Sequence, residues 1–187
     1  MTEPRMALLR DGEFDEAQTA ISRSYVWNGS VINVVRLFAR HMDFFAAFKP
    51  FARYAQFRSP LPARIRELAI LRLLVLNRGD YEWGHHCRIG REAGLSWDEI
   101  ARIKIGSDAG WNAQDQAILR TVDSLRRDAD LDDDLYAEVR AFLSERELFD
   151  LVVTVGNYNL VSTLLKVART PCDAGAASLA DPLPSGP

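Results

Sequence analysis

The sequence has very little cysteine. Only two of its 187 residues are cysteines, Cys87 and Cys172, and they lie far apart in the chain. Neither a Cys-x-x-Cys redox pair nor a local cysteine-based zinc site can be built from them. A disulfide scaffold is excluded as well, and the low cysteine content fits a reducing cytoplasm.

An excess of charge of one sign is also missing. Lysine and arginine together number 23 against 26 acidic residues, which gives a formal net charge of -3. Binding to nucleic acid requires a basic footprint, so we expect no nucleic-acid partner.

Long apolar runs are absent by inspection. Before Arg10 the longest apolar run has four residues, which is too short for the core of a signal peptide. No later stretch is read as a membrane span, so we expect a cytoplasmic protein with no membrane partner.

A helical pattern dominates what is present. Hydrophobic residues make up 48% of the chain, which is enough for one sizeable core, and their spacing of three and four residues predicts helices nearly throughout. We therefore expect an all-α, single-domain helical bundle of seven to nine helices. Pro50 is expected to divide a helical stretch over 31–57, and Gly79 to end a helix over 62–78 as a left-handed cap.

Composition divides the chain into three parts. Residues 1–29 are interpreted as an N-terminal extension and residues 30–170 as the helical domain. Residues 171–187 are rich in proline, glycine and alanine, and we expect this tail to wrap the surface or a partner.

Two adjacent histidines are the first candidates for chemistry. His86 lies four residues after Glu82, so on a helix the two share a face, where a carboxylate can orient an imidazole and raise its pKa. The pair is then a general acid/base, or alternatively an ordinary surface ion pair. His85 and His86 point about 100° apart on a helix and cannot both bind one ion, so no metal site is expected.

Glu67 and Cys87 are further candidates. Glu67 lies at the margin of an apolar helix, where a carboxylate must find a partner or stay protonated, and it is either a functional group or a boundary residue paired with Arg64 or Arg66. Cys87 is either a nucleophile beside His86 or a side chain that fills core space.

Four segments carry a resemblance: the run from Arg66 to Arg72, the segment Tyr81-Glu82-Trp83-Gly84-His85-His86, the stretch Arg91-Glu92-Ala93-Gly94-Leu95-Ser96, and a last-helix segment over 154–161. Together they resemble the carboxymuconolactone decarboxylase family. The resemblance extends over roughly residues 30 to 172 and is closest to the longer branch of the family. It implies an all-α fold whose protomers associate as dimers, trimers or hexamers, so we expect a homo-oligomer.

The wider superfamily includes alkylhydroperoxidase-D-type enzymes, whose pattern is a glutamate, a Cys-x-x-Cys pair and a histidine. By resemblance, the glutamate falls on Glu67 and the histidine on His86, whereas Gly79 and Glu82 occupy the two cysteine positions. A dithiol peroxidase needs both thiols, so thiol-peroxidase activity is not expected.

The resemblance implies a lyase that removes CO₂ from a small carboxylated lactone or a related carbonyl compound, without a cofactor. Such a reaction needs a proton source and a donor to the developing oxyanion. We expect the catalytic residues to be His86 for proton transfer, Glu82 to orient it and Glu67 as a second acid/base or a brace. The expected substrate-binding residues are Tyr81, Trp83, His85 and Tyr158. The alternatives are a lactone hydrolase, an isomerase or a catalytically silent oligomeric binding protein.

The expected helix geometry separates Glu67 from His86. Glu67 lies about 18 Å before Gly79 along its helix, and His86 about 10 Å after it, so a plain hairpin leaves the two offset by about 8 Å. Contact then requires a steep crossing, a bridging water or a glutamate from another subunit.

Overall fold

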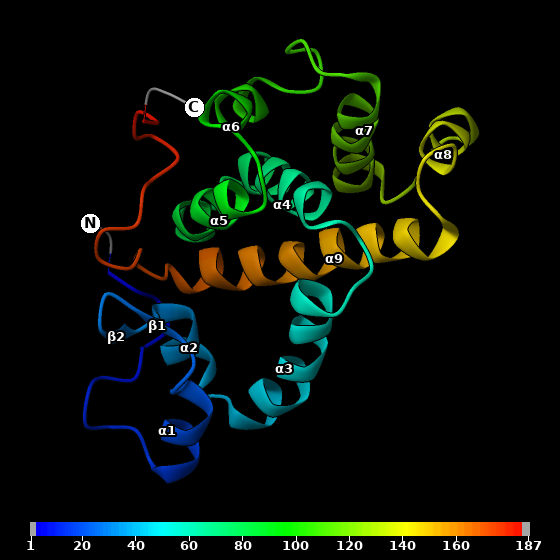
Figure 1. Cartoon of the computed structure of the whole chain (residues 1–187). Helices are drawn as coiled ribbons and strands as arrows, with labels where there is room; N and C mark the ends of the chain where they lie inside the picture. The colour runs from blue at the N-terminus through cyan, green and yellow to red at the C-terminus, as the bar shows by residue number, and fades with distance from the viewer. Residues whose placement is uncertain (1–2, 185–187) are drawn as a thin grey trace.

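The structure, a computed structural model, describes residues 3–184, and within this range the chain is almost entirely helical (Figure 1). The nine helices and one short hairpin of this described range confirm the all-α prediction and the expected number of helices. The elements in chain order are α1 (Glu16–Ser22), β1 (Val26–Trp27), β2 (Ser30–Val31), α2 (Asn33–Phe38), α3 (Met42–Phe57), α4 (Ala63–Asn77), α5 (Asp80–Glu92), α6 (Trp97–Ile105), α7 (Ala113–Asp128), α8 (Asp133–Arg140) and α9 (Glu145–Ala168).

Helix α4 is the centre of the main core. It packs against α5, α6, α7 and α9, and its residues 67–74 are all buried. A helix that is apolar on nearly every side has to be covered on every side, which explains this position. Figure 1 shows the 24-residue α9 running across the molecule, with α4 and α5 on one side and α2 and α3 on the other.

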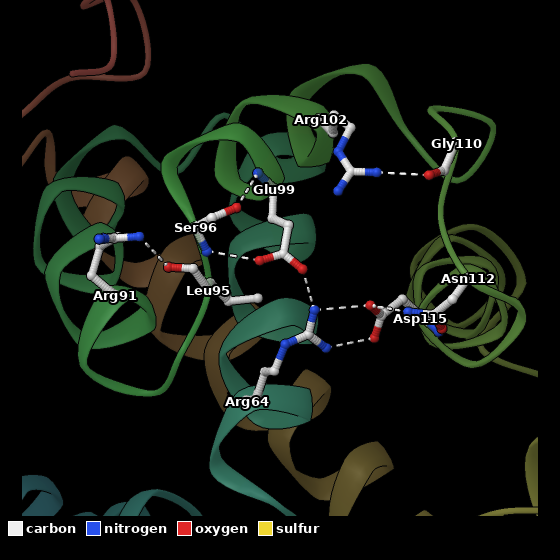
Figure 2. A network of polar contacts seen from close by, with 9 residues as sticks. All are labelled: Arg64, Arg91, Leu95, Ser96, Glu99, Arg102, Gly110, Asn112 and Asp115. Carbon is white, nitrogen blue, oxygen red and sulfur yellow. Dashed lines mark hydrogen bonds and ion pairs between the residues drawn. The ribbon is translucent and has the colours of Figure 1, made fainter. Parts of the chain in front are cut away.

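Two arginines attach α4 to α7. Arg64 binds Asp115 through both Nη atoms, at 2.7 and 2.9 Å, and Arg72 binds Asp123 through Nε and Nη2, at 2.6 and 3.0 Å. Figure 2 shows that Arg64 also contacts Glu99 at the start of α6. Because the pairs share one spacing along both helices, α4 and α7 run in the same direction, and two bidentate contacts fix their register.

Two predictions about where helices end were wrong. Pro50 lies inside α3, and the break in the helical stretch falls at residues 39–41 instead. Proline removes a hydrogen bond to the carbonyl of Ala46, but both residues are exposed, so water can replace the lost donor. At the end of α4 the left-handed residue is Arg78, with φ 52°, and Gly79 is the N-cap of α5 with φ -84°.

The hairpin before α2 was not predicted. Asn28 and Gly29 have φ values of 48° and 81°, as a type I′ turn requires, and they connect β1 to β2. An Asn-Gly pair between two short extended segments is a strong hairpin signal.

The described part of the C-terminal tail, residues 171–184, folds back onto α5. Asp80, the first residue of α5, accepts hydrogen bonds from Ser178 Oγ at 2.8 Å and from the Leu179 backbone N–H at 2.6 Å. Lys104 of α6 donates to the Leu179 carbonyl at 2.8 Å. The expectation that the tail wraps the protein's own surface is met for this segment, while residues 185–187 lie outside the described range.

Helix α9 corrects the expectation that no segment has the length of a membrane span. It is long and apolar enough to cross a membrane by length and composition alone. Half of its most apolar 18-residue window is buried inside the fold, as in the core helix of a soluble protein.

Candidate functional site

Glu67 and His86 form a direct pair between α4 and α5. Glu67 Oε2 lies 2.8 Å from His86 Nδ1; the glutamate is completely buried and the histidine is 5% exposed. The predicted 8 Å offset was therefore wrong, and no second subunit is needed for the contact. The hairpin estimate compared positions along the helix axes and left out the lengths of the two side chains. Helix α5 packs closely on α4, since a Cβ atom at Gly90 would lie 3.1 Å from Leu71 Cδ1 and 3.8 Å from Glu67 Cβ.

This contact also fixes which ring nitrogen is available. An ionised carboxylate can accept hydrogen bonds but has no proton to donate. The neutral imidazole therefore donates from Nδ1 to Glu67, and its Nε2 is left as the basic nitrogen. Glu67 Oε1 accepts a further hydrogen bond from Arg66 Nε at 3.2 Å. The orienting role expected of Glu82 thus belongs, by geometry, to Glu67.

Glu82 lies in the first turn of α5 and has no hydrogen-bond partner within residues 3–184. Neither of its carboxylate oxygens makes a hydrogen bond to any described residue, and the side chain is 6% exposed. Burial raises the pKa of Glu82 to about 8, and the nearby Ser162 hydroxyl offsets only part of that shift. Glu82 is therefore mainly protonated at neutral pH, and as an acid it is a hydrogen-bond donor.

Tyr158 closes the site from α9. Its ring stands edge-on to the His86 ring, with centroids 4.8 Å apart at 90°. Burial raises the pKa of Tyr158, and the charges of Glu67 and Glu82 raise it further, so the hydroxyl stays neutral. The structure thus brings Glu67, Glu82, His86 and Tyr158 to one region between α4, α5 and α9.

Gly79 makes room for this arrangement. A Cβ atom there would lie 2.8 Å from Ser162 Oγ, 2.9 Å from Leu74 Cδ2 and 3.2 Å from Glu82 Oε2. Since its φ is negative, any residue could adopt the backbone conformation, and the requirement for glycine is one of space.

Three of the residues expected to bind substrate, Tyr81, Trp83 and His85, contact the tail or the main core instead. Asp173 of the tail accepts hydrogen bonds from Tyr81 Oη at 2.6 Å and from His85 Nε2 at 2.9 Å. Trp83 is fully buried in the main core, with Lys104 over its ring. Of the four predicted substrate-binding residues, only Tyr158 contacts His86.

Neither thiol is placed for redox chemistry. Cys87 is buried, and burial raises its pKa to about 12. Cys172 is exposed, but its thiol is partly shielded from solvent; this shielding, together with the charges of Asp80 and Asp173, raises its pKa to about 11. The positions where the thiol enzymes carry cysteine hold the N-cap Gly79 and the protonated Glu82.

Arg66 and Ser162 belong to the site although neither was singled out from the sequence. Arg66 was considered only as a partner for Glu67, and nothing in the local pattern around Ser162 marks it, because its position beside Glu82 depends on how α9 packs. Within residues 3–184, no three His, Cys, Asp or Glu side chains converge as metal ligands.

Comparison with known proteins identifies the fold and a family match over part of the chain. The family described as "Carboxymuconolactone decarboxylase family" matches residues 42–122, the stretch that carries Glu67, Glu82 and His86. A protein of unknown function from Agrobacterium tumefaciens is similar in structure, with a TM-score of 0.68 and 24% identity over 73% of this chain and 96% of that one. No curated protein matches the sequence.

Two further solved structures cover nearly the whole chain. A peroxidase-related protein with the alkylhydroperoxidase AhpD core, from Ralstonia eutropha JMP134, has a TM-score of 0.80 and 14% identity over 91% of this chain and 93% of that one. The debrominase Bmp8, solved with 2,3,4-tribromopyrrole, has a TM-score of 0.72 and 12% identity over 92% of this chain and 93% of that one. The fold is therefore that of the AhpD-like proteins. The family match covers residues 42–122, which is less than half of the chain, whereas the likeness of fold extends over nearly all of it.

Proposed function

We propose that the protein is a lyase that decarboxylates a small carboxylated lactone, or a related carbonyl compound, by general acid/base catalysis. The observation that carries the proposal is the pair of carboxylic acids in opposite environments. Glu67 is hydrogen-bonded to His86 and Arg66, whereas Glu82 is buried without a partner and has a pKa of about 8. Sites that separate two acids in this way assign them different roles in proton transfer.

Decarboxylation would proceed in two steps. The bond between the carboxylate carbon and its neighbour breaks, CO₂ leaves, and the electron pair moves into the lactone carbonyl as an enolate. The acid form of Glu82 donates a hydrogen bond to the developing oxyanion, and a neutral Tyr158 hydroxyl is a second candidate donor. His86, after taking up a proton from solvent at Nε2, then delivers that proton to the carbon that lost CO₂ and returns to the neutral form.

Glu67 would support the proton transfer without touching the substrate. It holds the imidazole through Nδ1 and balances the charge of the imidazolium form. Complete burial of Glu67 keeps water from competing for this contact.

A CO₂-release assay on small unsaturated lactones that carry a carboxylate tests the proposal. We expect substrate-dependent CO₂ release that falls by roughly 10²- to 10⁴-fold in His86→Ala, the usual share of general acid/base catalysis. A matched control is His41→Ala, because His41 lies at the exposed start of α3. Turnover of the lactones without CO₂ would instead indicate a hydrolase or an isomerase.

A further inference from the structure

Helix α9 carries a polar side chain at every fourth residue over four turns. The row runs from the exposed Arg146 through Asp150, Thr154 and Tyr158 to Ser162. Residues four apart on a helix are neighbours one turn from each other, so the five side chains form one ridge that winds slowly around the helix. The other residues that α9 buries are apolar, except for Asn157 beside the row. The spacing therefore singles out one polar line on an otherwise apolar buried side.

The row contains buried atoms without a hydrogen-bond partner. Asp150, Thr154 and Ser162 are almost completely buried, yet Asp150 Oδ2, Thr154 Oγ1 and Ser162 Oγ make no hydrogen bond to a described residue. The side-chain oxygen of Asn157 is in the same situation. Leaving such atoms unpaired costs free energy, and native proteins satisfy most of them with ordered water. A run of these atoms along one ridge indicates a line of bound water.

The hydroxyl of Thr154 is oriented differently from those of two other helical threonines. Thr121 in α7 and Thr163 in α9 each donate to the carbonyl four residues earlier, at 2.8 and 2.7 Å. This bond is a common way for a threonine inside a helix to satisfy its hydroxyl. Thr154 does not make it, although it is as deeply buried as Thr121. Its hydroxyl is therefore available to water that lies between it and its neighbours in the row.

The outer end of the row lies at the surface. Arg146 is exposed, and the partly buried Tyr54 of α3 donates a hydrogen bond to Asp150 Oδ1 at 2.8 Å. The other carboxylate oxygen, Asp150 Oδ2, has no donor among the described residues. A carboxylate one turn inside the surface can take up a proton from solvent and pass it on.

The inner end of the row reaches the groups that handle protons in the proposed reaction. Tyr158 packs edge-on against His86, and Ser162, one turn further along α9, lies beside Glu82. His86 is nearly buried, and each turnover requires it to take up a proton from solvent. A buried proton donor therefore needs a path along which it is recharged.

We propose that Asp150, Thr154 and Tyr158, with ordered water between them, conduct a proton from solvent to Nε2 of His86. The need for this proton rests on the proposed function. Consecutive members of the row are about 6 Å apart along the helix axis, a gap that one bridging water can close.

The transfer leaves every group of the row unchanged. A proton from solvent protonates Asp150 Oδ2, and Asp150 becomes ionised again when it releases a proton inward. Each water and hydroxyl on the way accepts one proton as it gives up another, and Nε2 of His86 gains the last one. Loss of CO₂ from a carboxylate leaves an electron pair on carbon that takes up one proton, so one proton crosses the row in each turnover.

Bound water beside Thr154 is the test in the unaltered protein. Water-to-protein NOE measurements on methyl-labelled protein should show a long-lived water beside the Thr154 methyl group. They should show none beside the methyl group of Thr121, which is equally buried but already hydrogen-bonded. Absence of water beside Thr154 would overturn the proposal, and this result does not depend on whether a variant folds.

Exchange of the His86 ring proton with water tests the transfer itself. At a pH where the ring is charged, magnetisation transfer from water to ¹⁵N-labelled histidine reports the exchange rate of the Nε2–H. We expect Thr154→Val to slow this exchange about tenfold, the effect of losing one hydrogen-bonded link. Thr154→Ser keeps the hydroxyl and should keep the rate.

Thr163→Val is the control, because Thr163 lies on the same helix outside the row and its hydroxyl bonds to the backbone. An unchanged exchange rate in Thr154→Val, or an equal slowing in Thr163→Val, would contradict the assignment.

The CO₂ assay separates this inference from the proposed function. In a lyase, Thr154→Val should lower CO₂ release and raise the solvent isotope effect in D₂O, because proton delivery becomes the slow step. Thr154-dependent exchange at His86 without CO₂ release keeps the proton path and removes the lyase. CO₂ release with the same rate and the same isotope effect in Thr154→Val keeps the lyase and removes the proton path.

Discussion

At the scale of single residues, the site depends on two buried glutamates whose surroundings differ. Both carboxylate oxygens of Glu67 make hydrogen bonds, whereas neither oxygen of Glu82 makes one to a described residue. A buried carboxylic acid without partners costs stability, and such costs persist at sites where a function requires them.

Glu82→Gln should therefore stabilise the protein above acidic pH. The pKa of Glu82 is raised from 4.5 to about 8 in the folded state, so the folded protein disfavours the ionised form that the unfolded chain adopts. The cost is absent below about pH 4, grows as pH rises above 4.5 and levels off above pH 8. Urea unfolding at pH 7 should show a gain on the order of 2–3 kcal/mol that disappears near pH 4.

Glu92→Gln is the matched control, because Glu92 lies on the same helix in an exposed pair with Arg88. An equal gain in both variants, or a gain for Glu82→Gln that does not depend on pH, would mean that Glu82 is already ionised in the folded protein.

Gly79→Ala should be costly although the backbone permits it. The added methyl group would meet Ser162, Leu74 and Glu82 at 2.8 to 3.2 Å, which is overpacking. We expect a loss of about 1–3 kcal/mol in the free energy of unfolding. Gly156→Ala is the control, since a Cβ there has no neighbour within 4 Å and alanine favours a helix. A loss at Gly156 as large as that at Gly79 would contradict the steric explanation.

At the scale of elements, the described tail is held to the helical core by one carboxylate in particular. Burial alone would raise the pKa of Asp173, but hydrogen bonds from His85, Tyr81 and the Asn33 backbone N–H bring it below its ordinary value of 3.8. A depressed acid pKa contributes stability at neutral pH, and that contribution is lost as pH falls below about 4.

Acid should therefore release the tail. Limited proteolysis with pepsin at pH 2 to 4 should cut the segment 171–184 before the helical core. Asp173→Asn should make the tail susceptible already at neutral pH to a protease active there, and Asp181→Asn, a change at an exposed tail residue, should not. Cleavage in the core before the tail would contradict this prediction.

Sequence patterns predicted the elements better than their crossings. The helices that carry Glu67 and His86 were expected from the spacing of apolar residues. The pairing of His86 with Glu67 could not be predicted, because spacing along a chain gives no crossing angle. The position of Tyr81 and His85 against Asp173 depends on the tail, whose composition indicates no fold.

At the scale of the whole molecule, α9 leaves an apolar face uncovered. Phe149, Val152, Leu160 and Val167 are between 42% and 64% exposed and recur at three-, eight- and seven-residue steps along one side of the helix. Exposed apolar side chains gathered on one face are typical of an interface. We propose that a second copy of the chain covers it, consistent with the homo-oligomer expected from the sequence.

Light scattering tests the oligomer. Wild type should have a mass that is a multiple of 21.1 kDa at micromolar concentration, and Leu160→Glu should lower it toward the monomer. Tyr136→Glu is a control of similar exposure on another helix, α8. A monomeric wild type would remove the proposal.

The tautomer of His86 tests the central claim most directly. ¹⁵N–¹H NMR of the histidine rings should show the neutral His86 with its proton on Nδ1 in the wild type, because Glu67 Oε2 accepts from that atom. Glu67→Leu should shift the proton toward Nε2, and Glu82→Gln should leave the tautomer unchanged. A wild-type His86 with its proton on Nε2, or a tautomer that responds to Glu82→Gln and not to Glu67→Leu, would contradict the account.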